Sequence, residues 1–313
     1  MLSLKSIYSD SAFWKACRKL TFAVLRFSMV PAMVREIFQK DKVTIILYHQ
    51  INSQNFERHI VALKKRYNFI HFRDYIKARE NHDYSLPEKA MIITFDDGYS
   101  SNYELLPIIQ KYDVPVIMFI CSSIMDTNRK LWSDYEVQGY STKQFKKMPN
   151  DERRCLMNDA GFEEQKEFSY RSALNSQEIR EMSNIVEFQS HTRYHSVLPN
   201  CSDQIAAEEI GLSKKELEEK LGLNIQSLSY PCGDYSNRDI KLAKEAGYRY
   251  GFTVDHHFNT LNTDSYRLRR LCIPDDADVN EALVNASGLK IFLRSKIGKL
   301  DYGYTENGIS NKR

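Results

Sequence analysis

The stretch AMIITFDDGY, residues 90–99, decides the fold that we expect for this chain. An apolar run with β-branched residues ends in two adjacent carboxylates, Asp96 and Asp97, and Gly98 then permits a sharp turn. The pattern predicts a buried strand whose C-terminal tip presents acid groups. Neighbouring carboxylates repel each other when both are charged, and a shared cation would relieve that repulsion. An ordinary polar turn is the alternative, because Asp-Asp-Gly is also common in turns.

A second predicted strand ends in the same way. In residues 186–195 (VEFQSHTRYH), apolar and polar residues alternate at first, and the segment then carries His191 and His195, four positions apart. At this spacing both imidazoles can converge on one ion. Two histidines and one carboxylate form a three-ligand catalytic zinc site with a position left open for water. Taken alone, the segment is equally compatible with two solvated loop histidines, but its combination with Asp96 and Asp97 argues against coincidence.

Two further predicted strands have polar tips. Residues 225–235 (IQSLSYPCGDY) contain a proline and a glycine, which can hold a turn that aims a backbone N–H into a pocket, as an oxyanion hole requires. An ordinary proline–glycine turn fits this segment equally well. Residues 43–50 (VTIILYHQ) form a hydrophobic strand that ends in His49, and a lone histidine in this position is more often structural than catalytic.

Together these segments resemble the polysaccharide deacetylases of carbohydrate esterase family 4, the NodB-homology domain. Residues 94–98 (TFDDG) match the first motif of the family and residues 190–195 (SHTRYH) match the second. Residues 229–233 (SYPCG) match the third motif less specifically, and the resemblance spans residues 43–272. It is closest to the poly-N-acetylglucosamine deacetylases, and it implies an α/β fold, a distorted (β/α)7 barrel.

The resemblance also implies roles for individual residues. Asp97, His191 and His195 would bind a divalent metal, for which zinc is the leading candidate, and Asp96 would be the catalytic base. The backbone N–H of Cys232 would help to stabilise the oxyanion. Tyr230 and Pro231 would contribute to substrate binding.

Two departures from the family pattern matter. Ser229 stands where the third motif usually begins with an arginine that steadies the base. Residues 268–272 (LRRLC) lack the histidine of the late leucine-x-histidine motif, which supplies the general acid. Because the motif order is permuted in the poly-N-acetylglucosamine deacetylases, the early strand makes His49 the candidate acid. Which arginine replaces the missing one stays open, with solvated surface charge as the alternative for each of the candidates, Arg193, Arg269 and Arg270.

The composition bounds the class of protein. A chain of 313 residues can bury one large core, and 42% hydrophobic with 27% charged residues is ordinary for a soluble globular protein. A net charge of +3 and the lack of a basic stripe interleaved with aromatics give no argument for nucleic-acid binding. The six scattered cysteines are expected to be reduced thiols, which favours the cytoplasm.

The alternation of short apolar runs with helical stretches predicts parallel strands, and polar chemistry at the strand ends predicts a barrel. We expect a deacetylase domain over 41–275 with an insertion at 122–184, and a C-terminal helix with a mobile tail over 276–313. Trp132 in the insertion could stack on a sugar ring, or it could anchor the insertion to the barrel.

Residues 1–40 form a basic amphipathic segment. Arg26 interrupts its apolar run well short of the roughly 20 residues that a membrane-spanning helix needs, and it weakens any secretory signal. We expect a helix that packs on the domain, as a cap on the barrel, or that lies on an anionic membrane face. The expected localisation is therefore cytoplasmic, with peripheral membrane association left open.

The function expected from these features is metal-dependent removal of N-acetyl groups from N-acetylglucosamine-type sugars, in a poly- or oligosaccharide or a lipid-linked glycan. Two alternatives stay open. The chain could be a glycan-binding pseudoenzyme, which the missing arginine and late histidine favour. It could also be a non-haem iron enzyme, because two histidines and a carboxylate also describe that facial triad. The adjacent Asp96 argues against an oxygenase, which needs no water-activating base there.

Overall fold

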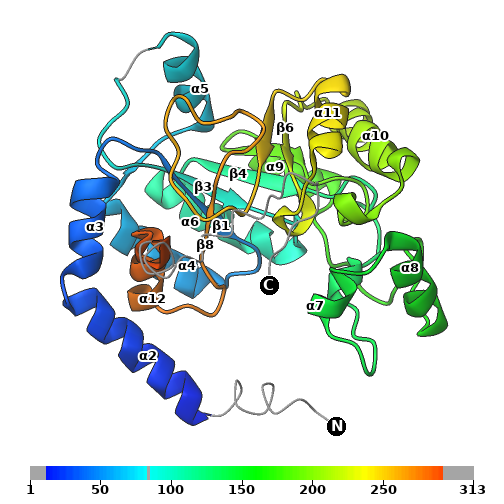
Figure 1. Ribbon diagram of the computed structural model, residues 1–313, viewed down its shortest axis with the longest axis horizontal. Coiled ribbons are helices and arrows are strands. Elements are labelled where there is room, and N and C mark those ends of the chain that lie inside the picture. Colours follow the sequence, from blue (N-terminus) through cyan, green and yellow to red (C-terminus); the bar gives the residue numbers. More distant parts are fainter. Residues whose placement is uncertain (1–11, 83–84, 292–313) are drawn as a thin grey trace.

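The computed structural model describes residues 12–82 and 85–291 (Figure 1). A parallel sheet lies at its centre, with strands in the order β7-β6-β5-β4-β3-β1-β8, while the short β2 pairs with β3 beside this path. The strands are β1 Thr44–Tyr48, β2 Asn68–Phe69, β3 Ala90–Phe95, β4 Val116–Ile120, β5 Val186–Ser190, β6 Ser227–Ser229, β7 Tyr250–Phe252 and β8 Leu271–Cys272.

Helices connect and cover the strands. The α-helices are α2 Ala12–Phe27, α3 Val30–Phe38, α4 Ser53–Lys64, α5 Phe72–Glu80, α6 Leu106–Tyr112, α7 Thr142–Phe145, α8 Asn150–Asp159, α9 Ser176–Met182, α10 Asp203–Leu221, α11 Asn237–Glu245 and α12 Val279–Ala286. Four 3₁₀ helices, η1 Ser100–Leu105, η2 Trp132–Asp134, η3 Leu198–Asn200 and η4 Pro231–Gly233, occupy the loops.

The strands are buried on both faces, as near-continuous apolar runs predict for a parallel sheet. One apolar cluster, which includes Ile92, Phe119 and Phe252, fills the inside of the curved sheet. A larger cluster, which includes Ile93 and Met118, packs between the outside of the sheet and the helices. The side chains of each strand therefore alternate between two apolar layers.

The sheet curves into an incompletely closed barrel. Within the described residues, β7 and β8 at the two edges do not pair, and a single parallel bridge between Phe252 and Leu268 links this side. The seven strands of the main path and the surrounding helices confirm the predicted distorted (β/α)7 architecture. Because all pairs are parallel, the C-terminal tips of the strands lie at one end of the barrel.

Local signals in the sequence explain several helix ends. Ser236 caps α11 and forms a capping box with Asp239. Gly222 ends α10 in the left-handed conformation with φ of 66°. These ends fix where the chain turns back toward β6 and β7.

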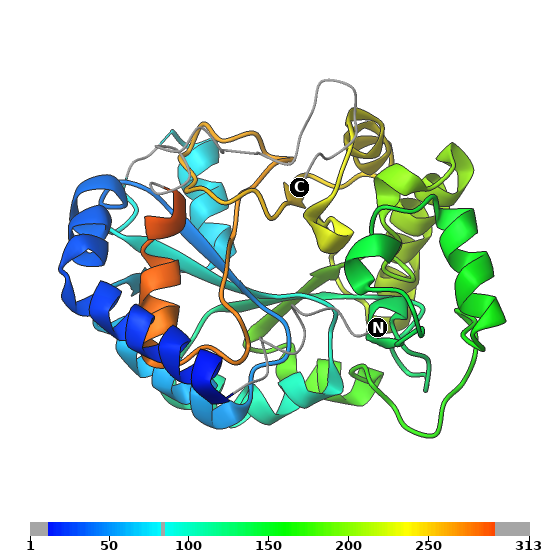
Figure 2. The same ribbon diagram turned by 60° about the horizontal axis from the view of Figure 1, so that its bottom comes forward.

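Helices α2, α3 and α12 pack against one another at one side of the barrel, where Figure 2 shows α2 beside α12. In the described part of the chain no helix is both long enough and apolar enough to cross a membrane. The described residues end at 291, so the predicted C-terminal tail lies outside them. All six cysteines are free thiols, as expected.

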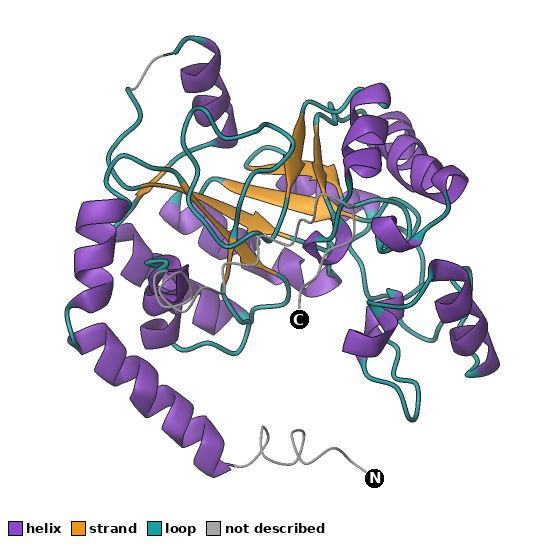
Figure 3. Cartoon of the chain, viewed as in Figure 1, coloured by secondary structure: helices purple, strands orange, loops and turns teal. Residues whose placement is uncertain are grey.

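The segment between β4 and β5 carries η2, α7, α8 and α9. Figure 3 shows α7 and α8 at the side of the sheet, with long loops that lead into α7 and out of α8. A separate apolar cluster, which includes Trp132, Phe145 and Met157, holds this segment together and also contains Val197 from the loop after β5. The segment is thus packed against the loop that follows one of the strand tips.

Candidate metal centre

The tips of β3 and β5 bring three side chains to one point. Ligand atoms of Asp97, His191 and His195 all lie within 4.8 Å of one another, and all three residues are buried. The Nε2 atoms of His191 and His195 each lie 3.3 Å from Oδ1 of Asp97. The residues predicted from sequence to share a cation are therefore clustered.

The backbone at these tips adopts conformations that non-glycine residues rarely take. Asp97 has φ of 72°, Thr192 has φ of 67° and His195 has φ of 60°. Left-handed backbone of this kind costs roughly 1–2 kcal/mol per residue and concentrates at functional sites. Gly98 permits the turn after Asp97, and it is also required for a steric reason, because a Cβ there would lie 2.6 Å from Cγ2 of Ile120.

His191 is oriented by β6. Its Nδ1 lies 2.8 Å from the carbonyl oxygen of Ser229, which fits a protonated Nδ1 that donates to this oxygen. Nε2 then faces Asp97. Burial lowers the pKa of this imidazole, but the charges of Asp96 and Asp97 outweigh burial and raise the pKa, so a bound ion would take the place of the Nε2 proton. Metal-binding histidines almost always have such a partner on their other ring nitrogen.

Glu209 on α10 holds the loop between the two histidines. Its Oε2 accepts the backbone N–H groups of Arg193 and Tyr194 at 2.9 and 3.0 Å, and its Oε1 accepts the hydroxyl of Ser196 at 3.1 Å. Glu209 is buried, so these bonds are shielded from water. One carboxylate on a rigid helix therefore fixes the path of the chain from His191 to His195.

The charge state of the cluster suits a cation. Burial lowers the pKa of His195 to about 3, so this imidazole is neutral and its lone pair is available. Burial opposes ionisation of Asp97, but at acid pH, where the imidazoles are protonated, the charges of His195 and His191 outweigh burial and hold the pKa of this carboxyl below its usual range. Oδ1 of Asp97 is buried with no hydrogen-bond partner in the described protein. A buried acceptor between two imidazoles, in a set of two nitrogens and one oxygen, fits a divalent ion such as zinc.

Asp96 lies beside this cluster, with its Oδ2 atom 3.8 Å from Nε2 of His191. Arg270 holds it in a two-pronged ion pair, with Nη1 2.7 Å from Oδ1 and Nη2 2.8 Å from Oδ2. Ser229 donates its hydroxyl to the same Oδ2 at 3.1 Å and accepts from Arg270 at 2.8 Å. Burial alone would raise the pKa of Asp96, but the charge of Arg270 outweighs it and the pKa is lowered.

Arg270 is thus the arginine that steadies Asp96, and it reaches the site from the segment just before β8. The serine in the motif position takes part, because its small side chain leaves room for the guanidinium. Arg193 is instead paired with Glu216 through Nη2 at 2.8 Å. Arg269 is only partly buried, whereas Arg270 is completely buried.

His49 and Cys232 lie at the other two predicted tips. His49 is half-buried after β1, and its backbone N–H donates to Asp275 at 3.0 Å. Its charge is among those that lower the pKa of Asp96 and of Asp97, so the ring lies within electrostatic reach of the centre.

Cys232 sits in the turn after β6 with φ of 59°. Burial raises the pKa of its thiol to about 11, although the nearby Lys146 opposes this, so the thiol is neutral at pH 7. Gly233 is required beside it, since a Cβ there would lie 2.0 Å from Cγ2 of Val254. This packing fixes the turn that carries the Cys232 backbone.

The three residues predicted to bind substrate, Trp132, Tyr230 and Pro231, all have buried side chains, and their role in substrate binding stays a prediction. Trp132 is 2% exposed, Arg153 covers its ring at 4.3 Å, and its indole N–H donates to the carbonyl of His195 at 2.8 Å. The ring of Tyr230 is buried against Tyr235, and its hydroxyl donates to the backbone. Pro231 is also buried.

Of the two uses expected for Trp132, these contacts favour the anchor over stacking on a sugar ring. Trp132 anchors the insertion and supports the backbone of a predicted metal ligand. Tyr230 and Pro231 hold the turn that carries Cys232.

Several supporting residues were not found from the sequence: Glu209, Asp275 and Lys146. Glu209 reads as one more charge on the outer face of an amphipathic helix, and nothing in its spacing marks it. For Arg270 a signal was available, because Leu268 and Arg270 alternate onto one face of an extended segment. Both are completely buried, as that alternation indicates.

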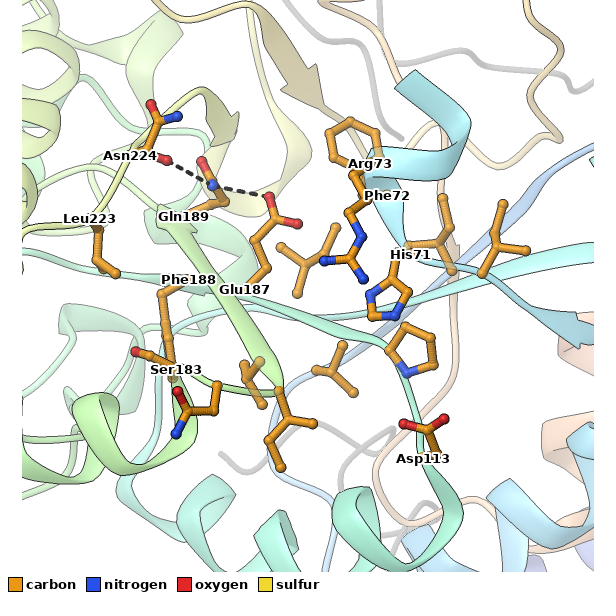
Figure 4. Close-up of a pocket in the computed structure, with 18 residues that line it drawn as sticks. His71, Phe72, Arg73, Asp113, Ser183, Glu187, Phe188, Gln189, Leu223 and Asn224 are labelled. Atoms are coloured by element: carbon orange, nitrogen blue, oxygen red, sulfur yellow. Dashed lines mark hydrogen bonds between the residues drawn. The ribbon is translucent and has the colours of Figure 1, made fainter. Parts of the chain in front are cut away.

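A cavity of about 490 Å³ opens at the opposite end of the barrel, where β4 and β5 begin (Figure 4). Glu187 and Gln189 line it, and Gln189 donates to Oε1 of Glu187 at 3.1 Å and to the carbonyl of Asn224 at 3.2 Å. None of the residues of the metal centre lines this cavity. It is therefore not the place where that centre would meet a substrate.

Comparisons with known proteins agree with this geometry. The family model for polysaccharide deacetylase matches residues 83–251. A poly-β-1,6-N-acetyl-D-glucosamine N-deacetylase of Staphylococcus epidermidis is 24% identical over 242 residues, which cover 73% of this chain and 70% of that protein.

Solved structures with the same fold include the Streptococcus pyogenes deacetylase PplD in complex with acetate, with a TM-score of 0.59 and 18% identity over 79% of this chain and 99% of that one. IcaB from Ammonifex degensii has a TM-score of 0.56 and 19% identity over 80% of this chain and 98% of that one. Because the family model covers more than half of the chain, this protein belongs to the polysaccharide deacetylases, hydrolases that act on carbon–nitrogen bonds.

Proposed function

We propose that this protein is a metal-dependent deacetylase that removes N-acetyl groups from N-acetylglucosamine units of a poly- or oligosaccharide or a lipid-linked glycan. The observation that carries the proposal is the pairing of two arrangements at one end of the barrel. Asp97, His191 and His195 form a ligand cluster, and a separate carboxylate, Asp96, is held beside it by Arg270.

A divalent ion bound by the cluster would supply Lewis acidity for the acetyl carbonyl and would acidify a water molecule. Asp96 would take the proton of that water. Its carboxylate receives three donors, two from Arg270 and one from Ser229, and a carboxylate has about four acceptor positions. The lowered pKa of Asp96 keeps it ionised and able to act as a base at neutral pH.

Two further groups would complete the reaction. The N–H of Cys232, in the left-handed turn after β6, would donate to the oxyanion of the tetrahedral intermediate. His49 would protonate the departing amine, which is otherwise a poor leaving group. Acetate and a glucosamine unit result.

The substrate class rests on the named relatives, since the matched staphylococcal protein is a deacetylase of poly-β-1,6-N-acetyl-D-glucosamine. The pseudoenzyme alternative loses one of its two supports, because Arg270 supplies the ion pair that Ser229 cannot. The absence of a late histidine remains its other support, and the role proposed for His49 addresses it. The proposal therefore needs a direct test of turnover.

The test measures acetate release and metal content on the same samples, with β-1,6-linked N-acetylglucosamine oligomers and chitooligosaccharides as substrates. The wild type should release acetate. Asp96→Asn should retain the metal and lose turnover, whereas His191→Ala should lose the metal. No acetate from either substrate by the metal-loaded wild type would contradict the proposal, and equal metal loss in both variants would contradict the division of roles.

A further inference from the structure

The two N-terminal helices carry a concentration of exposed apolar side chains. Seven side chains from α2, α3 and the joint between them are each at least 58% exposed, and we call them the apolar stripe: Phe13, Leu20, Val24, Phe27, Met29, Met33 and Ile37. Ten of the fourteen large exposed hydrophobic residues in the described chain lie between residues 13 and 38. Such concentration marks an interaction site, whereas scattered single residues would need no explanation.

The stripe faces outward because the opposite side of α2 is already occupied. Phe22 and Leu25 pack against the cluster of Val34, Val284 and Leu289. The spacing of the exposed residues on α2, at 13, 20, 24 and 27, places them on one face of the helix. Helix α2 therefore has two apolar sides. One side packs against the rest of the fold, and the other is exposed.

Polar contacts fix α2 in this orientation. Arg18 donates to both carboxylate oxygens of Asp276 at 2.7 and 3.0 Å and also pairs with Glu281 at 2.8 Å. Arg26 donates to Asn280 at 2.6 Å. Both arginines bind side chains in and just before α12, so a rotation of α2 that buried the stripe would break these contacts. Figure 1 shows α2 and α3 along the outer edge of the described fold.

The charge of this region complements an anionic surface. The first forty residues contain seven lysines and arginines but two acidic residues, a net charge of +5, while the whole chain carries +3. The rest of the chain is therefore slightly acidic. Helix α2 itself has four basic residues and no acidic one, and the exposed Lys19 lies next to Leu20 of the stripe.

We propose that the apolar stripe binds the surface of an anionic phospholipid membrane, with α2 and α3 lying in the interfacial plane. An amphipathic helix with basic residues beside a Phe- and Leu-rich face is the usual device for such binding. A 16-residue helix is about 24 Å long, too short to span the roughly 30 Å hydrocarbon core. A second copy of this chain is a poorer occupant, because two regions of net charge +5 would repel each other. This inference does not depend on the deacetylase activity.

The experiment is sedimentation of the full-length protein with vesicles of phosphatidylcholine alone or with phosphatidylglycerol. Leu20→Glu with Val24→Glu removes two stripe residues, and Leu212→Glu on α10 is the control, since Leu212 is a single exposed apolar residue elsewhere. The wild type and Leu212→Glu should bind the anionic vesicles more tightly than the neutral ones. The double variant should lose at least about tenfold in partitioning, which is about 1.4 kcal/mol, because two apolar side chains no longer leave water on binding.

Thermal denaturation and sedimentation velocity of the same variants make the result decisive. The proposal expects unchanged melting temperatures and a concentration-independent monomeric mass. A wild type that binds neither vesicle, or a double variant that binds as well as the control, would overturn the proposal. A wild-type dimer that the double variant dissociates would also overturn the proposal, because the stripe would then bind a second copy of the chain. A lowered melting temperature of the double variant would overturn it as well, because the stripe would then stabilise this chain's own fold.

Discussion

Among the single residues of the site, Arg270 has the largest part in setting the chemistry of Asp96. It reaches the carboxylate with two parallel hydrogen bonds inside a fully buried pocket. Paired charges of this kind tolerate burial because each satisfies the other, but removing one leaves an uncompensated buried charge. The same contact therefore supports both the ionised state of the base and the stability of the fold.

We predict that Arg270→Met raises the pKa of Asp96 and destabilises the protein by about 3–5 kcal/mol. The acid limb of the pH profile of kcat/KM should move to higher pH, because burial then acts on Asp96 without the opposing guanidinium. Arg269→Met, at the neighbouring partly buried position, is the control and should leave the profile in place. An unshifted profile in Arg270→Met would show that another group keeps Asp96 ionised.

The ion pair of Asp96 and Arg270 also makes the free energy of unfolding depend on pH, in a direction that follows from the pKa of Asp96. The pKa of Asp96 in the folded protein lies below its ordinary value of 3.8. Its ion pair therefore contributes stability at pH values above that value, and the contribution is lost as pH falls through the folded-state pKa. The difference in unfolding free energy between wild type and Arg270→Met should be largest near neutral pH and should shrink on acidification.

A substitution at Trp132 distinguishes two roles of this residue, support of the His195 backbone and stacking on the substrate. Trp132→Phe keeps an aromatic ring in the buried cluster but removes the N–H that donates to the carbonyl of His195. We expect metal affinity to fall by roughly tenfold, as for other outer contacts to metal ligands, with KM for the glycan unchanged in the metal-saturated enzyme. Tyr170→Phe, an exposed position in the same insertion, should change neither quantity. A raised KM with unaltered metal affinity would restore the stacking interpretation.

At the scale of elements, the loop after β5 depends on α10. Glu209 receives two backbone N–H groups and one hydroxyl from this loop, all between the histidines or directly after them. Helix α10 is 19 residues long and packs along the barrel, so it is a rigid support. A loop that must hold His195 in a left-handed conformation needs such support.

Glu209→Ala should therefore weaken metal binding and lower the unfolding free energy by about 1–3 kcal/mol, the usual cost of leaving buried donors without an acceptor. The matched control is Glu208→Ala on the same helix, since Glu208 is exposed and receives its hydrogen bond from Gln204. Isothermal titration with Zn²⁺ and chemical denaturation would measure both effects. Equal behaviour of the two variants would mean that the loop holds its shape without Glu209.

The strand tips could be predicted from the sequence because each apolar run ends abruptly in polar residues. Parallel strands then place those ends together, and Asp97, His191 and His195 do meet. The strand tips did not single out Arg270 among the three candidate arginines, since its approach to Asp96 depends on β8 pairing beside β1, and only its alternation with Leu268 pointed to a buried position. The sequence left two uses open for Trp132 because an aromatic among polar residues looks exposed, and the apolar cluster that the insertion folds around it favours the anchor.

For the whole molecule, the core and the metal centre are separate sources of stability. The apolar clusters fill both sides of the sheet, while the ligand cluster occupies only the end where β3 and β5 finish. Because the barrel can bury its core without the ion, we do not expect unfolding when metal is removed. A bound ion should nevertheless stabilise the folded state by mass action.

We predict that a chelator abolishes activity but leaves the far-ultraviolet circular dichroism spectrum intact. Adding Zn²⁺ at about 100 times its Kd should raise the unfolding free energy by about 2.7 kcal/mol, and His191→Ala should show no such rise. Unfolding by the chelator would show that the ion holds the barrel together.

The central claim is that Asp97, His191 and His195 bind one ion while Asp96 stays free of it. The most direct measurement is anomalous scattering at the zinc edge from crystals of the wild-type protein grown with Zn²⁺. We predict one strong peak about 2.0–2.2 Å from an imidazole nitrogen of each histidine and from a carboxylate oxygen of Asp97, with Asp96 still paired to Arg270. No peak at this position, or a peak ligated by Asp96 in place of Asp97, would contradict the account.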